Sequence, residues 1–239
     1  MTALRSKFIE FLELRGYAKA TVNNYVDAVV HFTRWLRVSP LAITTDKARE
    51  YLIYLKRERK LAPRSLNIHL YGLRSFCECM LPDSDIMKPF KRRRTPKHQP
   101  VVLGAADVLT MIETCENLKA KAIISTIYSA GLRLQECCEL KIADVDSKRM
   151  ILHIANGKGQ KPRYALLSPR TLQILREYYL KYRPRLWLFE GRTPEKALGR
   201  RSVAELIYIS GLRAGIKRRV SPHMLRHSFA THLLRSRWA

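Results

Sequence analysis

Residues 221–233 read Ser-Pro-His-Met-Leu-Arg-His-Ser-Phe-Ala-Thr-His-Leu, and the assignment of the fold starts from them. The pattern predicts a helix from Pro222 to Arg235. On that helix His223 and Arg226 are three residues apart, so their side chains lie on one face. Taken alone, a histidine and an arginine at this spacing more often form a solvated or capping pair than a binding site.

Two features upstream carry further cations. Gly131-Leu132-Arg133 puts an arginine at the predicted start of a helix, directly after a glycine that interrupts the preceding one. Gly157-Lys158-Gly159 puts a lysine at the tip of a predicted hairpin, because Asn-Gly lies there between two β-rich runs, 150–154 and 164–167. Each feature alone is more often an ordinary surface charge or an exposed turn.

Considered together, these side chains form a coherent set for phosphate chemistry. The guanidinium groups of Arg133 and Arg226 can hold the non-bridging oxygens of one phosphodiester and stabilise the charge of a pentavalent transition state. A flexible lysine, here Lys158, can donate a proton to a departing sugar oxygen. His223 can bond the phosphate or carry the proton of a nucleophile.

Hydrophobic periodicity predicts a mainly α protein with a small β-hairpin or sheet, which is an α+β fold. Pro40 breaks one apolar stripe in the first part, and Pro63 suits the first turn of another helix. The predicted helices lie near residues 4–12, 22–36, 45–55 and 63–76 in the first part, and near 105–117, 119–130, 134–141, 169–179, 201–211 and 222–235 in the second.

The sequence divides into two predicted domains and a linker. Residues 1–82 carry the first four helices, residues 83–100 form a basic, proline-containing linker, and residues 101–239 form the second domain. Prolines prevent a continuous helix in the linker, and its run Lys91-Arg92-Arg93-Arg94 suits a phosphate backbone. A nuclear-localisation signal can look the same, but nothing else in the sequence supports that alternative.

The charge balance indicates a polyanionic partner. Lysine and arginine number 45 against 20 acidic residues, which gives a net charge of +25. Such an excess repels itself in a compact chain unless a polyanion neutralises it, so DNA or RNA is the first candidate. A ribosomal protein or a membrane-surface binder would carry the same charge. The cations expected to contact DNA phosphates are Lys91, Arg92, Arg93, Arg94, Arg64 and Arg74.

Other classes of protein are disfavoured by what the sequence lacks. No apolar run approaches the roughly 20 residues needed to span a bilayer, and residues 1–5 lack the apolar core of a secretory signal. The five cysteines are odd in number and form no Cys-x-x-Cys pair, so neither disulfides nor a zinc site is expected. We therefore expect a cytoplasmic protein, associated with the nucleoid, that has no membrane partner.

The order of these motifs resembles that of tyrosine recombinases of the phage integrase family. Similar patterns occur in bacterial chromosome-dimer recombinases and in integron, phage and transposon integrases. Residues 1–82 resemble the helical, SAM-like core-binding domain of that family, and residues 101–239 resemble its catalytic domain. The motifs that carry the resemblance are Gly131-Leu132-Arg133-Leu134-Gln135-Glu136, the turn at 157–159 and the stretch at 221–233.

The resemblance implies a catalytic role for four residues. Arg133 corresponds to the first arginine that holds the scissile phosphate. His223 and Arg226 correspond to the His-x-x-Arg pair on the same phosphate. Lys158 corresponds to the hairpin lysine that protonates the leaving 5′ oxygen.

The resemblance also implies supporting groups. An acidic residue should hold the first arginine, and Glu136 fits that position better than Asp144. His227 is expected to be a supporting residue of its helix rather than a catalyst. No metal or other cofactor is expected, because a phosphotyrosyl intermediate conserves the energy of the cleaved bond in the family.

One departure from the family pattern concerns the nucleophile. All eleven tyrosines precede Arg226, and the last is Tyr208. The family continues with a Leu-Gly-His-type stretch and then a tyrosine that attacks phosphorus. We therefore expect a catalytic domain truncated before its nucleophile, which binds DNA but does not cleave it unless a neighbouring protomer supplies the tyrosine in trans.

Three functions remain open at this level. The first is a site-specific recombinase or integrase that assembles as a homotetramer on two paired sites in duplex DNA. The second is a non-catalytic DNA-binding remnant, accessory protein or inhibitor of a recombinase. The third is a structural RNA-binding protein, which the charge permits but the ordered motifs do not require.

Overall fold

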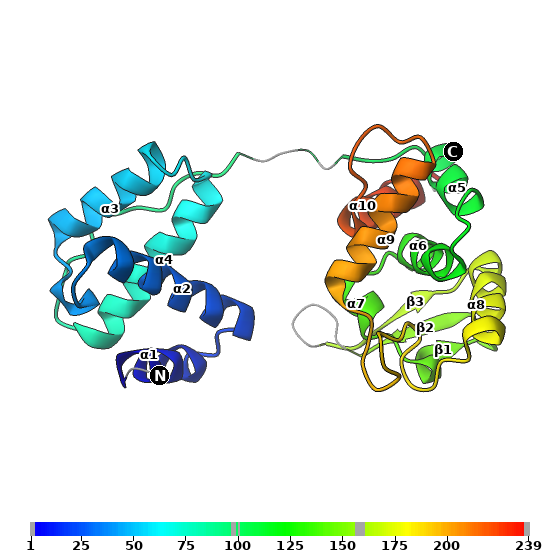
Figure 1. The fold of residues 1–239 in the computed structure, drawn as a ribbon, viewed down its shortest axis with the longest axis horizontal. Coiled ribbons are helices and arrows are strands. Elements are labelled where there is room, and N and C mark those ends of the chain that lie inside the picture. The colour runs from blue at the N-terminus through cyan, green and yellow to red at the C-terminus, as the bar shows by residue number, and fades with distance from the viewer. Residues whose placement is uncertain (1–2, 97–98, 100, 156–160, 237–239) are drawn as a thin grey trace. The chain divides into compact units, whose positions relative to one another are not determined.

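A computed structural model describes residues 3–96, 99, 101–155 and 161–236 of the chain. Two compact units cover residues 1–98 and 99–239 (Figure 1). Helices predominate in both units, and a small antiparallel sheet lies in the second, so the predicted α+β class is confirmed. Within the described residues, no helix is long and apolar enough to cross a membrane.

The first unit is a helical bundle. Close contact between two of its helices depends on Gly72, because a Cβ atom there would lie 2.8 Å from the Cβ of Ala28. The hydroxyl of Thr44 caps another helix by accepting a hydrogen bond from the N–H of Lys47 at 3.2 Å. The helices are α1 (Ala3–Leu14), α2 (Lys19–Leu36), α3 (Thr45–Arg57) and α4 (Pro63–Met80), with a 3-10 turn at Pro40–Ala42.

The basic segment that follows α4 is bound to the first unit. The Asn67 side chain donates to the carbonyl of Arg93 at 3.0 Å and accepts from its N–H at 2.9 Å. Arg74 donates to the carbonyl of Phe90 at 2.6 Å, and the side chain of Met87 is buried. The prolines exclude helix here but do not prevent packing, so this part of the expected linker lies against α4.

Replacing Asn67 with alanine is expected to release this segment. Both hydrogen bonds to Arg93 would be lost, which should cost about 1–3 kcal/mol of stability in the first unit, because Asn67 is buried. Limited trypsin digestion should then cut faster within residues 91–94. Asn23→Ala, at an exposed position of α2, serves as the control. Equal digestion rates for the two variants would contradict this prediction.

The second unit combines helices with a three-stranded sheet. The strand order is β1-β2-β3, and both pairs are antiparallel, with Leu152 of β2 opposite Ala165 of β3. The strands are β1 (Val145–Asp146), β2 (Ile151–Ile154) and β3 (Arg163–Leu166). The helices are α5 (Ala105–Glu113), α6 (Leu118–Ala130), α7 (Leu134–Cys138), α8 (Pro169–Tyr182), α9 (Arg200–Arg213) and α10 (Pro222–Ser236), with a 3-10 turn at Ile142–Asp144.

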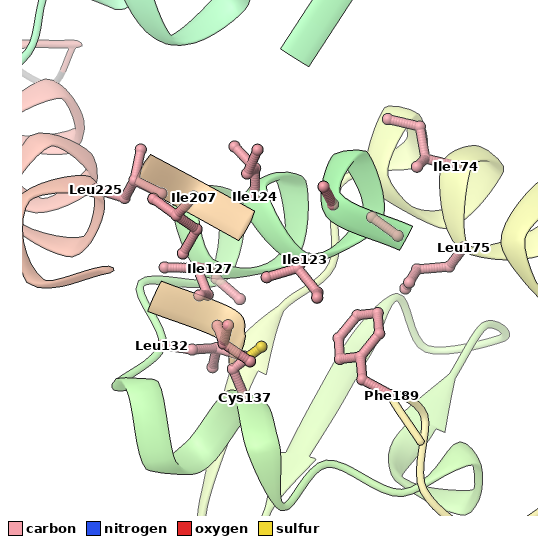
Figure 2. Packing of buried hydrophobic residues seen from close by; sticks show 14 of the residues in the cluster. Ile123, Ile124, Ile127, Leu132, Cys137, Ile174, Leu175, Phe189, Ile207 and Leu225 are labelled. Carbon is pink, nitrogen blue, oxygen red and sulfur yellow. The ribbon is translucent and has the colours of Figure 1, made fainter. Parts of the chain in front are cut away.

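Helix α6 forms the centre of the second core. Ile123, Ile124 and Ile127 are fully buried on it. Figure 2 shows these side chains among apolar groups from several other elements, including Phe189 and Leu225. A helix that is buried on most of its surface has apolar residues on all sides. The sequence of α6 is therefore only weakly amphipathic.

The structure corrects two helix boundaries and adds one strand. The helix expected at 105–117 ends at Glu113, because the side chain of Asn117 caps the next helix by accepting from the N–H of Ala120 at 3.1 Å. The helix expected at 134–141 ends at Cys138. Beyond it the chain pairs with a distant segment, and the carbonyl of Leu140 accepts from the N–H of Leu188 at 2.8 Å. The third strand, β1, was not expected from the sequence.

Candidate functional site

Gly131 determines how the chain enters the candidate site. Its φ of +57° ends α6 in a left-handed conformation, which glycine adopts without steric cost. Two residues later Arg133 is the N-cap residue of α7. A Cβ at position 131 would lie 2.5 Å from Cδ1 of Phe229, so the absence of a side chain also lets α10 approach closely. The carbonyl of Gly131 accepts a hydrogen bond from Nη1 of Arg226 on α10.

A single buried carboxylate, that of Glu136, collects three guanidinium groups. Its side chain is 1% exposed. Oε1 lies 2.5 Å from Nη1 of Arg133, and Oε2 lies 2.8 Å from Nη2 of Arg163 and 3.6 Å from Nη1 of Arg226. Oε2 also accepts from the N–H of Arg133 at 2.8 Å. We call these four residues the Glu136 cluster.

Burial, hydrogen bonds and neighbouring charges shift the pKa values of two members of the cluster, Glu136 and Arg226. Burial alone would raise the pKa of Glu136, but hydrogen bonds from the N–H of Arg133 and from the side chains of Arg163 and Arg133 hold it below its ordinary value. Burial and the neighbouring charges of Arg133 and Arg163 lower the pKa of Arg226, while Glu136 opposes this. The carboxylate is therefore ionised at neutral pH, and it compensates only part of the positive charge.

The cluster is arranged so that its positive charge faces outward. The side chains of Arg133, Arg163 and Arg226 are 40%, 34% and 28% exposed, whereas that of Glu136 is almost completely covered. Three cations against one anion leave a net charge of +2 within it. An incoming anion can therefore bind the guanidinium groups from outside while the carboxylate holds them from beneath.

His223 lies one helical turn from another histidine on α10. Its Nε2 is 2.7 Å from Nε2 of His227, so one ring donates to the other. Burial first, and then His227 and Arg226, lower the pKa of His223. Because a doubly protonated ring has no acceptor nitrogen, at least one of the two Nε2 atoms in this contact carries no proton.

The residues expected from the sequence divide into three groups. Arg133, Glu136 and Arg226 come together, as described above, and His223 lies on the same helix as Arg226. Asp144, the weaker candidate for holding the first arginine, instead contacts Nδ1 of His153 at 3.3 Å. The hairpin lysine, Lys158, lies outside the described residues.

The cations expected to contact DNA also differ in their surroundings. Arg64 and the run at 91–94 are exposed. Arg74 is instead half-buried, and its guanidinium donates to the carbonyls of Phe90 and Met87. Arg74 therefore stabilises the fold of the first unit.

Arg163 is the member of the Glu136 cluster that sequence reasoning missed. It belongs to β3, where alternate residues point to the same face, and Ala165 on that face is buried. An arginine two positions before a buried strand residue is therefore expected to point inward and to need a partner. That alternation was the available signal, but only the fold places Glu136 beneath it.

Comparisons with known proteins identify the family of this chain. The profile of the phage integrase family matches residues 102–239, and that of the phage integrase N-terminal SAM-like domain matches residues 4–84. The chain belongs to the phage integrase family of site-specific tyrosine recombinases.

Curated relatives match over nearly the whole chain. Tyrosine recombinase XerA of Pyrococcus horikoshii is 35% identical over 234 residues, covering 95% of this chain and 78% of the relative. Tyrosine recombinase XerC of Myxococcus xanthus is 33% identical over 259 residues, covering 98% of this chain and 85% of the relative.

Solved structures share the fold. A lambda integrase dimer bound to a COC′ core site has a TM-score of 0.76 at 17% identity, covering 96% of this chain and 88% of that one. The XerH recombinase bound to its difH substrate has a TM-score of 0.72 at 21% identity, covering 94% of this chain and 71% of that one. At these sequence identities, the structural similarity shows a shared fold only.

Proposed function

We propose that this protein acts on duplex DNA as a site-specific recombinase or integrase, and that the Glu136 cluster holds one backbone phosphate. The observation that carries the proposal is the convergence of Arg133, Arg163 and Arg226 on one buried carboxylate. These arginines come from α7, β3 and α10, which are far apart in the sequence. A buried counter-charge orients the guanidinium groups in advance, so a phosphate can bind without further ordering of the side chains.

The proposal assigns roles to two arginines of the cluster, to Glu136, to His223 and to Lys158. Arg133 and Arg226 bind the non-bridging oxygens and stabilise the charge that develops at phosphorus. Glu136 positions them and does not touch the substrate. His223, neutral at physiological pH, bonds the phosphate or accepts the proton of the attacking hydroxyl. Lys158 donates a proton to the leaving 5′ oxygen, and the reaction needs no metal or high-energy cofactor.

The assembly and setting follow from the same proposal. A homotetramer on two paired DNA sites is the form in which the family exchanges strands, and the solved relatives include a lambda integrase tetramer bound to a Holliday junction. Exposed cations at Arg64 and at residues 91–94 would add contacts to the DNA backbone. The protein would therefore work at the nucleoid, in the cytoplasm.

Duplex binding and its dependence on salt test this proposal. With six to ten phosphate contacts, the affinity for duplex DNA should fall by roughly 10³-fold or more between about 50 and 200 mM NaCl. Arg226→Gln and Arg133→Gln should each weaken binding by about tenfold or more at fixed salt, because each removes charge-assisted hydrogen bonds. Thermal melting should show that each variant remains folded.

The matched control is Arg170→Gln. Arg170 pairs with Glu113 on the surface of the same unit, and both side chains are more than half exposed. This substitution removes one positive charge without altering the Glu136 cluster, so it should change the affinity by less than about threefold. If Arg170→Gln weakened binding as much as Arg226→Gln, the affinity would be that of a generic polycation.

The alternative function is DNA binding without cleavage, and the tyrosines within these 239 residues make it testable. None follows Tyr208 in the 239 residues. A polypeptide of these residues should therefore bind a nicked suicide substrate without forming a covalent adduct. A band that resists denaturant, formed by this polypeptide alone, would show that it cleaves DNA with another nucleophile.

A further inference from the structure

The first unit contains a basic and aromatic hollow that the proposed function does not use. Its volume is about 910 Å³, within the range of small-ligand pockets. It is formed by the C-terminal half of α2, by α3 and the loop after it, and by α4. Among the described residues, no carboxylate lines it. The lining residues are His31, Arg34, Trp35, Arg37, Tyr51, Tyr54, Leu55, Arg59, Leu61 and His69.

Aromatic rings form one wall of this hollow. The ring of Trp35 lies 5.3 Å from that of Tyr51 and 6.1 Å from that of Tyr54. The hydroxyl of Tyr51 is 3.1 Å from Nδ1 of His69, which fixes both rings. Trp35 and Tyr54 are half-buried, so part of each ring remains free to stack with an entering flat group. Nucleobases stack on such rings when they are unpaired.

Three arginines without a counter-charge surround the rings. Arg34, Arg37 and Arg59 are exposed, and no carboxylate pairs with any of them in the part of the chain that the structure describes. By contrast, Arg49 and Arg15 in the same unit pair with Asp46 and Glu78. Unpaired cations that share one hollow repel one another, and a phosphate relieves that repulsion while it accepts hydrogen bonds from the guanidinium groups.

The backbone at the rim is held in a conformation that side chains disfavour. Arg37 has a φ of 59° and Lys60 a φ of 48°, both in the left-handed region. Arg37 adopts it as the C-cap residue that ends α2. Burial, and then His31, lower the pKa of His69 to about 4, so this ring is neutral at physiological pH and the positive charge of the hollow comes from the arginines.

We propose that this hollow binds a nucleotide whose base is unpaired. The base stacks on Trp35 and Tyr54, and the phosphate groups bind Arg34, Arg37 and Arg59. A duplex keeps its bases stacked inside the helix, so only a nucleotide with an unpaired base offers a free ring face to Trp35 and Tyr54. The nucleotide can come from a free nucleoside triphosphate or from the unpaired end of a DNA strand, which present the same groups.

Quenching of Trp35 fluorescence tests the proposal with the full chain. The titrants are ATP, adenosine, inorganic pyrophosphate and a 5′-phosphorylated single-stranded oligonucleotide, at 150 mM NaCl to screen weak surface binding. ATP should quench saturably and bind at least tenfold more tightly than adenosine or pyrophosphate, because only ATP carries both base and phosphates. Trp35→Phe should abolish the quench and thereby assign it to this ring.

Substitutions locate the site. Arg34→Gln and Arg59→Gln should each weaken ATP binding by at least tenfold. Arg57→Gln removes the same charge from an exposed position of α3 that does not line the hollow, and it should change binding by less than twofold. The comparison of ATP with the oligonucleotide identifies the source, and tighter binding of either one supports the proposal.

Two results would overturn the proposal. One is equal binding of pyrophosphate and ATP, and the other is an equal loss in Arg57→Gln and Arg34→Gln, because both indicate unspecific attraction of anions. Neither result bears on the proposed recombinase function, because Arg226→Gln tests that function in the second unit. The two proposals can therefore fail separately.

Discussion

Replacing Glu136 with glutamine is expected to lower the free energy of unfolding of the second unit by about 3 kcal/mol, the lower end of what removing one partner of a buried ion pair costs. The variant leaves three guanidinium groups around a site that has lost its charge. The lower figure applies because those groups are partly exposed and recover some hydration. Urea unfolding, followed by Trp187 fluorescence in a background that carries both Trp35→Phe and Trp238→Phe, measures the loss.

The matched control for this prediction is Glu113→Gln. Glu113 accepts from Arg170 at 2.8 Å, but both side chains are more than half exposed, so this pair should contribute less than about 1 kcal/mol. Equal losses in the free energy of unfolding of the two variants would mean that Glu136 stabilises the cluster no more than a surface ion pair does.

The dependence of stability on pH gives an independent check on Glu136. Its pKa in the folded protein is lower than its ordinary value of 4.5. Its contribution is therefore fully present above that ordinary value and is lost as the pH falls through the lower, folded pKa. The difference in stability between the wild type and Glu136→Gln should be constant near neutral pH and should shrink below about pH 4.5. A difference that persists unchanged at lower pH would contradict the ionised carboxylate.

Replacing Gly131 with alanine should be the other large effect, with a loss of stability of about 2–5 kcal/mol. The left-handed conformation at φ +57° costs a Cβ-bearing residue about 1–2 kcal/mol. The overlap with Cδ1 of Phe229, at 2.5 Å, adds an overpacking cost of about 1–3 kcal/mol unless α10 shifts. A shift of α10 would also move Arg226, which bonds the carbonyl of Gly131. Weaker duplex binding should therefore accompany the loss of stability.

Gly215→Ala separates the two contributions. Gly215 has a φ of +74°, but nothing lies within 4 Å of a Cβ built there. It should therefore lose only the conformational part, about 1–2 kcal/mol, and should leave DNA binding unchanged. If the two glycine variants showed equal losses in the free energy of unfolding, the close packing of Phe229 on Gly131 would contribute nothing to stability.

Local patterns in the sequence predicted most of the helices and several members of the site. The three-residue spacing of His223 and Arg226 on one predicted helix needs no tertiary information, since helical geometry alone places them on the same face. The family motif at 131–136 directed attention to Glu136 rather than Asp144, and the structure brings Glu136 against Arg133. The catalytic roles of these residues stay predictions.

Errors arose where distant segments decide the local structure. The helix expected to reach residue 141 ends at Cys138, because the chain pairs there with residues 186–188. Arg74 looked like one more surface cation, yet it holds carbonyls 13 and 16 residues away. Neither contact leaves a periodic signal in the sequence.

By itself the sequence determined the helical content, the excess of positive charge and the helix that carries His223 and Arg226, because these depend on composition and on spacing within single elements. Only the tertiary structure decided that Arg163 joins Arg133 and Arg226 on one carboxylate. The physical reason is that the three arginines lie up to 93 residues apart, on a helix start, a strand and another helix. Their convergence follows from the packing of these elements in the second unit, which no local pattern records.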